Sequence, residues 1–138
     1  MKPKIVEKAW GTETWIVNTP LYCGKELRVD AGARSSLHRH HKKDETFYVL
    51  EGMLCVLTAH RRLTKKQVAS YTSKAVPCKS VRLTAGMSLR IKPGTWHRFV
   101  ASRDCSFIEF STHHSDRDVE RATKSIAAPK DGKEWTDI

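Results

Sequence analysis

The chain has 138 residues, about the size of one ordinary domain, and its 39% hydrophobic and 29% charged content excludes a disordered chain. The longest apolar runs have about five residues, whereas a membrane-spanning helix needs about 20, so a protein spanning the membrane by helices is excluded. The net charge of +10 is compatible with anionic partners such as nucleic acid, an anionic surface or a phosphorylated substrate.

Short β-like runs dominate the chain from residue 25 to residue 110. Apolar and other residues alternate within 27–30, 47–50, 87–91 and 105–110, and turns that contain Gly or Pro separate these runs. Side chains of a strand point to opposite faces in turn, so this alternation is typical of strands with one buried face. The pattern predicts an all-β protein built as an antiparallel sandwich or barrel.

A basic segment interrupts this pattern. Residues 59–80 contain six basic residues and no acidic one, and we expect them to form a long connection between strands. No stripe of stacking aromatic residues is interleaved with these charges, which argues against an RNA-binding surface. A solvated basic loop is therefore the preferred interpretation, and a nucleic-acid partner is not expected.

A second interruption lies near the C-terminus. Ser115 and Asp118 match a capping box, and the acidic residues of this segment suit the first turn of a helix. We therefore expect a short C-terminal helix over residues 115–126. This gives one domain over residues 1–126, followed by a C-terminal tail over residues 127–138.

The cysteines and the N-terminal segment indicate the cellular compartment in which we expect the protein. Cys23, Cys55, Cys78 and Cys105 are separated by 32, 23 and 27 residues, so the chain has neither a CxxC pair nor a dense disulfide framework. The N-terminal segment is basic but lacks the apolar stretch of a secretory signal. We interpret the cysteines as reduced thiols of a cytoplasmic protein.

Four potential metal ligands occur at linked spacings. His38 and His40 are two residues apart, so on a strand their side chains share a face. Glu45 follows after a turn from which the next strand can return, and His97 opens a further strand after a Pro-Gly turn. Three imidazoles and one carboxylate suit a divalent first-row metal such as Mn, Zn or Fe and leave coordination positions for substrate. The alternative is a structural cluster without a metal; the remaining histidines, including His114, are interpreted as surface residues.

The same residues resemble the cupin superfamily. Its first motif, G(X)5HXH(X)4E(X)6G, is matched at every spacing by Gly32, His38, His40, Glu45 and Gly52. Its second motif is matched at Gly86, Gly94 and His97, while Lys92 occupies the proline position and Ala101 replaces the final asparagine. The resemblance implies a small cupin (jelly-roll) β-barrel with the metal inside it.

A narrower resemblance covers about residues 9–121. The segments AWGTETW, KELRVDAG, SSLHRHHKKDETFYVLEG and IKPGTWHRF are similar to the mannose-6-phosphate isomerase-type cupins, and the same layout occurs in D-lyxose isomerases. The resemblance implies a metal-dependent aldose–ketose isomerase and a homodimer. The reaction could proceed through a metal-stabilised enediolate or through a metal-assisted hydride shift. The Tyr-Gly-Arg end of the mannose-6-phosphate isomerase family is absent after Arg121.

Two further residues are candidates for proton transfer. Lys25 shares a strand face with Leu27 and Val29, and Glu109 shares one with Phe107, so both can point into the barrel. Either could then act as acid or base near the metal. Alternatively, Lys25 begins its strand and reaches water, and Glu109 only pairs with a cation.

Three functions are compatible with this set of residues. The first is an isomerase of a sugar or sugar phosphate of the mannose, fructose or lyxose type. The second is an Fe(II)-dependent dioxygenase, because the same ligand set can hold iron and bind oxygen. The third is a sugar-binding module without turnover. The AWGTETW segment, the strand with Lys25 and the pair Ile108-Glu109 favour the isomerase.

Overall fold

The computed structural model describes residues 2–59 and 79–128, whose regular secondary structure is almost entirely β-strand. The strands are β1 (Lys4–Lys8), β2 (Gly11–Asn18), β3 (Cys23–Val29), β4 (His38–His40), β5 (Glu45–Glu51), β6 (Met53–Ala59), β7 (Lys79–Thr84), β8 (Ser88–Ile91), β9 (Trp96–Ala101), β10 (Cys105–Ser111) and β11 (Val119–Arg121). One short 3-10 helix, η1 (Asp116–Asp118), precedes β11. None of the described helical structure is long and apolar enough to cross a membrane.

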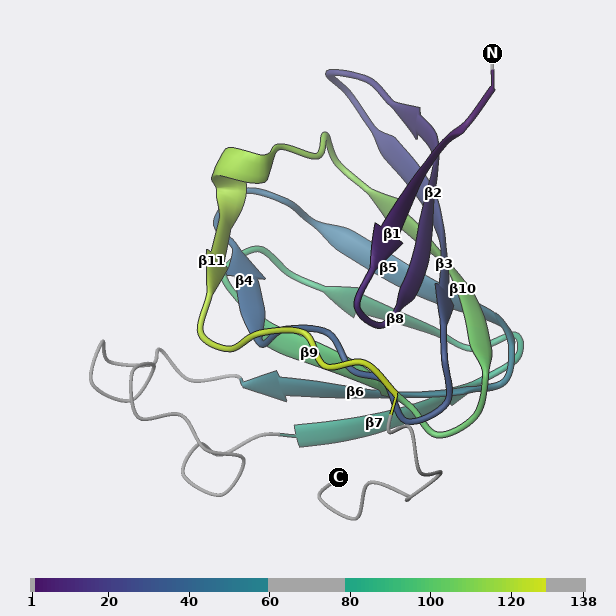
Figure 1. The fold of residues 1–138 in the computed structure, drawn as a ribbon. Coiled ribbons are helices and arrows are strands. Elements are labelled where there is room, and N and C mark those ends of the chain that lie inside the picture. The colour runs from purple at the N-terminus through teal and green to yellow at the C-terminus, as the bar shows by residue number, and fades with distance from the viewer. Residues whose placement is uncertain (1, 60–78, 129–138) are drawn as a thin grey trace.

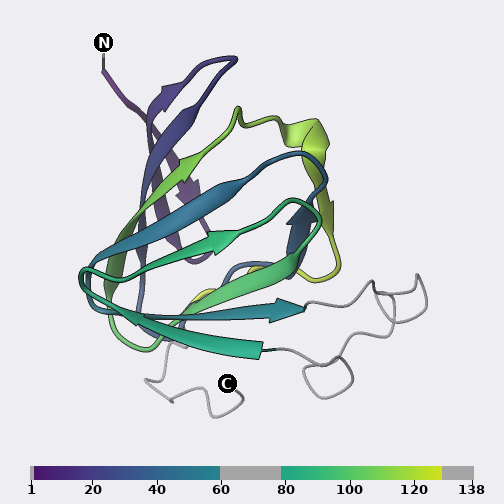
Figure 2. The same cartoon turned by 180° about the vertical axis from the view of Figure 1, so that it is seen from behind.

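The strands form two sheets that face each other (Figures 1 and 2). One sheet has the order β1-β2-β3-β10-β5-β8, and the other has the order β11-β4-β9-β6-β7. Every pairing in both sheets is antiparallel. This arrangement confirms the predicted all-β jelly-roll barrel.

The inner face of the larger sheet changes from apolar to charged along its strands. Leu27 lies opposite Phe107 in the register of β3 and β10, and two residues further on Lys25 lies opposite Glu109. Glu109 in turn lies opposite Phe47 of β5. The same alternation therefore directs apolar side chains into one end of the barrel and ionisable side chains into the other.

Aromatic side chains fill the apolar end. The ring of Phe107 lies 4.8 Å from that of Phe47 and 5.3 Å from that of Phe99, and Trp10 packs edge-on against Phe99 at 5.1 Å. All four are buried. The preferred offset or edge-to-face contacts add to the free energy gained from burying their area.

The structure corrects the expected C-terminal helix over 115–126. Ser115 does cap a turn, because its hydroxyl accepts a hydrogen bond from the backbone N–H of Arg117, but that turn is only the three-residue η1. The chain then becomes strand β11, which pairs with β4. Local capping signals predict a helix, but tertiary context overrides them here, since the segment pairs with the edge of β4, a strand distant in sequence.

The two other irregular segments are only partly described. β6 ends at Ala59 and β7 begins at Lys79, and the two strands are antiparallel neighbours. The basic connection predicted for 59–80 therefore joins adjacent strands, but its residues 60–78 lie outside the described part of the chain, as do residues 129–138 of the predicted tail.

Replacing Phe107 by Ala tests the aromatic core. The side chain is fully buried, so we expect the free energy of unfolding to fall by roughly 3–5 kcal/mol in urea denaturation. Phe110→Ala is the matched control, because Phe110 lies on the same strand but is 56% exposed. Equal losses in the two variants would contradict this description of the core.

Candidate metal centre

Three imidazoles of the smaller sheet lie close together, opposite the charged end of the larger sheet. His38 and His40 lie on β4, and His38 is paired in register with His97 of β9. The ring of His38 lies 4.4 Å from that of His97 and 5.2 Å from that of His40. One nitrogen from each of the three rings lies within 4.8 Å of the others, a spacing at which one ion could contact all three.

Backbone carbonyls orient two of these rings. The Nδ1 of His38 lies 2.8 Å from the carbonyl oxygen of Ser36, and the Nδ1 of His97 lies 2.9 Å from that of Thr95. Because a carbonyl only accepts, each Nδ1 carries a proton, and in the neutral ring the lone pair is then on Nε2. Such outer hydrogen bonds are the usual means of fixing metal-binding histidines.

Glu45 completes the cluster from the start of β5. Its Oε1 lies 2.8 Å from the Nε2 of His97, and its Oε2 lies 3.9 Å from the Nε2 of His40. Within residues 2–59 and 79–128, neither oxygen of Glu45, nor the Nε2 of His97, has a hydrogen-bond partner. Burying such atoms unsatisfied costs free energy, which a bound cation would offset. The donor set fits a divalent first-row metal.

The protonation states of His38, His40 and Glu45 also suit a metal cation. Burial and the neighbouring imidazoles hold the pKa of His38 well below its ordinary value, and burial brings the pKa of His40 to about 4. Burial alone would raise the pKa of Glu45, but His97, Lys43 and His40 lower it below the ordinary value. At neutral pH the rings of His38 and His40 are therefore uncharged and the Glu45 carboxylate is charged. Burial would lower the pKa of His97 as well, but its contact with Glu45 raises that pKa above the ordinary value.

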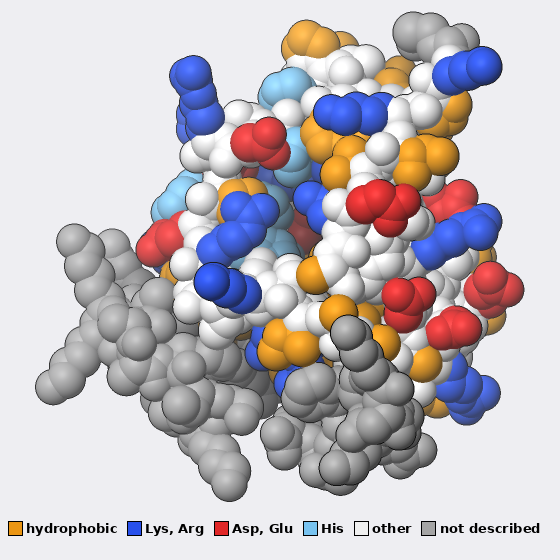
Figure 3. Space-filling model, in the orientation of Figure 1, with side chains coloured by type: hydrophobic (Ala, Val, Ile, Leu, Met, Phe, Trp, Pro, Cys, Tyr) orange, Lys and Arg blue, Asp and Glu red, His pale blue; other side chains and the backbone are white. Residues whose placement is uncertain are grey.

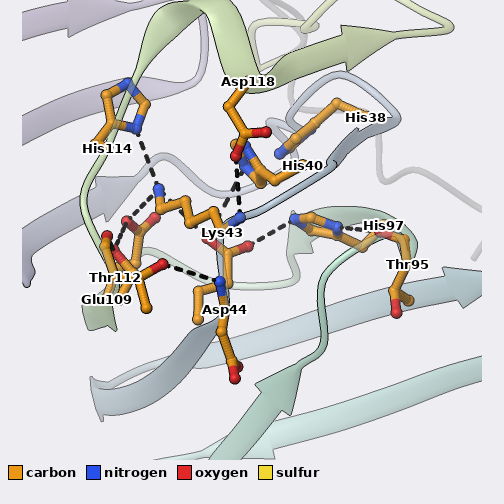
Figure 4. A network of polar contacts seen from close by, with 12 residues as sticks. His38, His40, Lys43, Asp44, Thr95, His97, Glu109, Thr112, His114 and Asp118 are labelled. Atoms are coloured by element: carbon orange, nitrogen blue, oxygen red, sulfur yellow. Dashed lines mark hydrogen bonds and ion pairs between the residues drawn. The ribbon is translucent and has the colours of Figure 1, made fainter.

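Lys43 is a central residue that the sequence reasoning missed. Its Nζ lies 2.7 Å from the Oε2 of Glu109, 3.5 Å from the Oε2 of Glu45 and 3.2 Å from the Nδ1 of His114 (Figure 4). Burial lowers its pKa, but the two carboxylates outweigh burial and raise it, so the side chain is a buried ammonium. The available signal was its position in the short turn that joins the strand of His40 to the strand of Glu45.

Both proton-transfer candidates point inward. Lys25 is 2% exposed, and its Nζ pairs with the Oε1 of Glu13 at 2.9 Å, so it does not reach water. Glu109 is buried and pairs with Lys43. Burial, assisted by the Glu45 carboxylate, raises the pKa of Glu109 against the opposing charges of Lys43 and Lys25. A carboxyl with a raised pKa is suited to general acid–base catalysis.

His114 corrects a prediction, because it was expected at the surface. Its ring accepts a hydrogen bond from Lys43 at Nδ1 and lies 4.9 Å from the ring of Trp15. Its Nε2 lies 3.0 Å from Asp116. Two hydrogen bonds between the side chain of Asn18 and the backbone of His114 hold this loop. No spacing rule links residue 114 to the cluster, because a loop places it there.

These side chains surround a cavity of about 120 Å³. Figure 3 shows it as a hollow in which imidazole, basic and acidic side chains gather. The lining includes His38, His40, Lys25, Lys43, Glu45 and Glu109. Its size and polarity suit a small, hydroxyl-rich molecule rather than an extended or apolar one, since pockets for drug-sized ligands measure about 300 Å³ or more.

The geometry defines a cupin barrel with a polar cavity at its histidine cluster. The family model described as D-lyxose isomerase matches residues 11–130. The chain therefore belongs to the D-lyxose isomerase family, a sugar-isomerase type of cupin. No curated protein matches the chain.

Solved structures support the fold. KdgF from Halomonas sp. has a TM-score of 0.63 and 20% identity, over 85% of this chain and 90% of its own. CapF from Staphylococcus aureus has a TM-score of 0.67 and 16% identity, over 92% of this chain and 34% of its own. Oxalate decarboxylase from Bacillus subtilis has a TM-score of 0.67 and 14% identity, over 86% and 30%. The chain thus spans about a third of the last two, and the likeness establishes the fold alone.

Asp118 fastens the turn that carries Lys43. Its carboxylate accepts hydrogen bonds from the backbone N–H groups of His41, Lys42 and Lys43 at 3.1, 2.9 and 3.0 Å (Figure 4). This turn joins the strand of His38 and His40 to the strand of Glu45. The C-terminal segment, although it is not the expected helix, therefore holds the cluster together.

Replacing Asp118 by Ala should weaken this clamp. We expect a loss of about 1–3 kcal/mol in the free energy of unfolding, measured by urea denaturation, since three donors lose a charged acceptor. Asp30→Ala, at an exposed position after β3, should change it by less than about 0.5 kcal/mol. An Asp118 variant as stable as the Asp30 variant would show that the clamp contributes nothing.

Proposed function

We propose that the protein is a metal-dependent aldose–ketose isomerase of a small sugar of the lyxose, mannose or fructose type. The observation that carries the proposal is the placement of two buried lysine–glutamate pairs beside the His38, His40, His97 and Glu45 cluster. Membership of the D-lyxose isomerase family supports the same reaction class. The small polar cavity is consistent with an open-chain sugar.

His38, His40, Glu45 and His97 are the residues that would hold the metal. Mn, Zn and Fe all accept three imidazoles and a carboxylate, so the ligands do not select one of them. When bound, a divalent cation polarises the substrate carbonyl and stabilises negative charge on the neighbouring oxygens. The chain's own residues then have to orient the sugar and move its protons.

Glu109 is the proposed acid–base residue. Its carboxylate takes the proton from C2 of the open-chain aldose and returns it to C1, while the hydroxyl proton on O2 passes to O1, and together these transfers convert the aldose to the ketose. Lys43 and Ser111 both donate hydrogen bonds to its Oε2, which leaves Oε1 for the proton. The raised pKa of Glu109 brings its affinity for that proton closer to what the reaction needs near neutral pH.

Lys25 is the proposed hydrogen-bond donor to the substrate. Its ammonium lies in the cavity wall, next to Glu109 in the register of β3 and β10. A hydrogen bond from this charged group to the carbonyl oxygen at C1 grows stronger as that oxygen gains negative charge. Lys25 and Glu109 thereby act on adjacent atoms of one substrate.

The buried pairs favour the isomerase over the two other hypotheses. A dioxygenase needs the metal ligands but has no use for an acid–base pair on C1 and C2. A sugar-binding module has no use for a carboxyl with a raised pKa, since neutral hydroxyl groups bind well to ordinary polar side chains. Burying Lys25 and Lys43 beside carboxylates is costly for stability and is therefore better explained by catalysis.

Metal content tests the ligand set. His97→Ala should lose most of the bound divalent metal measured by elemental analysis, together with turnover of D-lyxose and D-mannose followed by NMR. His41→Ala is the matched control and should keep both, because the His41 side chain is 53% exposed and pairs with Glu120 instead. Full metal content in the His97 variant would contradict the ligand assignment.

Two substitutions test the proton-transfer residues. Lys25→Met and Glu109→Gln should each lower kcat by at least roughly 100-fold, the usual range for an acid–base group, while metal content stays at the wild-type level. D-lyxose, D-mannose and their phosphates are offered separately to identify the substrate. Wild-type turnover in either variant would remove that residue from the mechanism.

A further inference from the structure

Two residues of the AWGTETW segment, Glu13 and Trp15, bind the Lys25 ammonium, and together they are called the Lys25 seat. Trp15 of β2 is paired in register with Lys25 of β3, and Glu13 lies two residues earlier on the same strand face. The Oε1 of Glu13 accepts hydrogen bonds from the Nζ of Lys25 at 2.9 Å and from the Nε1 of Trp15 at 2.6 Å. The ammonium also lies over the Trp15 ring, 4.1 Å from its centroid. One carboxylate and one aromatic face therefore hold this cation from two sides.

The Lys25 seat explains why Lys25 and Lys43 do not both pair with Glu109. Glu109 lies directly opposite Lys25 in the register of β3 and β10, but its short ion pair, at 2.7 Å, is with Lys43. A buried ammonium needs a carboxylate, and a lysine side chain is flexible enough to find the nearest one. Glu13 supplies that carboxylate on the far side of Lys25, which keeps Lys25 off Glu109.

The contacts of Glu13 keep its carboxylate charged. It is buried, and burial would raise its pKa, but the Lys25 ammonium and the hydrogen bonds from Lys25 and Trp15 lower it below the ordinary value. The carboxylate is therefore charged at neutral pH. A glutamine in its place would keep the shape and lose the charge.

We propose that Glu13 is a positioning residue that seats the Lys25 ammonium in the cavity wall, apart from the Lys43–Glu109 pair. Its value for catalysis rests on the proposed isomerase function. Without Glu13, Lys25 turns toward Glu109, which removes the substrate's hydrogen-bond donor and engages the acid–base carboxylate at the same time.

The seat can be observed without any turnover. Hydrogen-bonded, buried lysine ammonium groups exchange protons slowly enough to give ¹H–¹⁵N signals at low temperature, and Lys25→Met and Lys43→Met assign the two signals. Glu13→Gln should abolish or shift the Lys25 signal. Glu26→Gln is the matched control, because Glu26 pairs with Arg28 on the outer side of β3, and it should leave both signals unchanged.

Kinetics then test the positioning role. Glu13→Gln should lower kcat roughly 10- to 100-fold, the equivalent of one lost hydrogen bond to a charged group, with unchanged metal content. In the Lys25→Met background the same substitution should have no further effect, because Glu13 acts through Lys25. Additive losses, a wild-type Lys25 signal in the Glu13 variant, or a kcat of that variant within twofold of the wild type would each overturn the proposal.

A failure of the isomerase function gives a different result. Wild-type protein with a full complement of metal but no turnover of any sugar would refute the isomerase proposal. The ammonium signals would then decide alone whether Glu13 seats Lys25. An unchanged Lys25 signal in Glu13→Gln would reject the seat in that case as well.

Discussion

The structure depends on the cost of burying polar atoms that lack an aligned hydrogen bond. Glu45 and His97 are both almost completely enclosed, and their facing atoms lie 2.8 Å apart without an aligned hydrogen bond. A fold that only needed stability would replace such a cluster by apolar side chains at little cost. The barrel keeps it, and orients His38 and His97 through backbone carbonyls, which is the arrangement expected of a site built for a cation.

The barrel separates stability from chemistry along its own strands. On β10 the inner face carries Phe107 in the aromatic core and Glu109 in the cavity, only two residues further on. Packing of the aromatic side chains fixes the positions of the strands, and the charged side chains further along the same strands are held in place as a result. Asp118 and the loop around His114 close that end from the C-terminal segment, which explains why this segment is a strand and a turn rather than a free helix.

The sequence predicted the parts of the site that follow a fixed spacing. His38 and His40 share a face because strands alternate, and the turns before Glu45 and His97 bring their strands back to that face. The helix over 115–126 was wrong because its capping signals are local, whereas the edge of β4 that replaces it is distant in sequence. Lys43 looked like one more charged residue of a turn. The roles of Glu13 and His114 could not be predicted, since their contacts arise only when separate strands and loops meet.

The central claim is that one divalent cation lies among His38, His40, Glu45 and His97. Anomalous diffraction from crystals of the metal-loaded protein, recorded at the absorption edge of the bound metal, tests it most directly. The account predicts a single strong peak within coordination distance of an imidazole nitrogen of each histidine and of a Glu45 oxygen, which is about 2.0–2.2 Å if the metal is zinc. A fully loaded protein whose peak lies elsewhere, with the four side chains unchanged, would contradict the account.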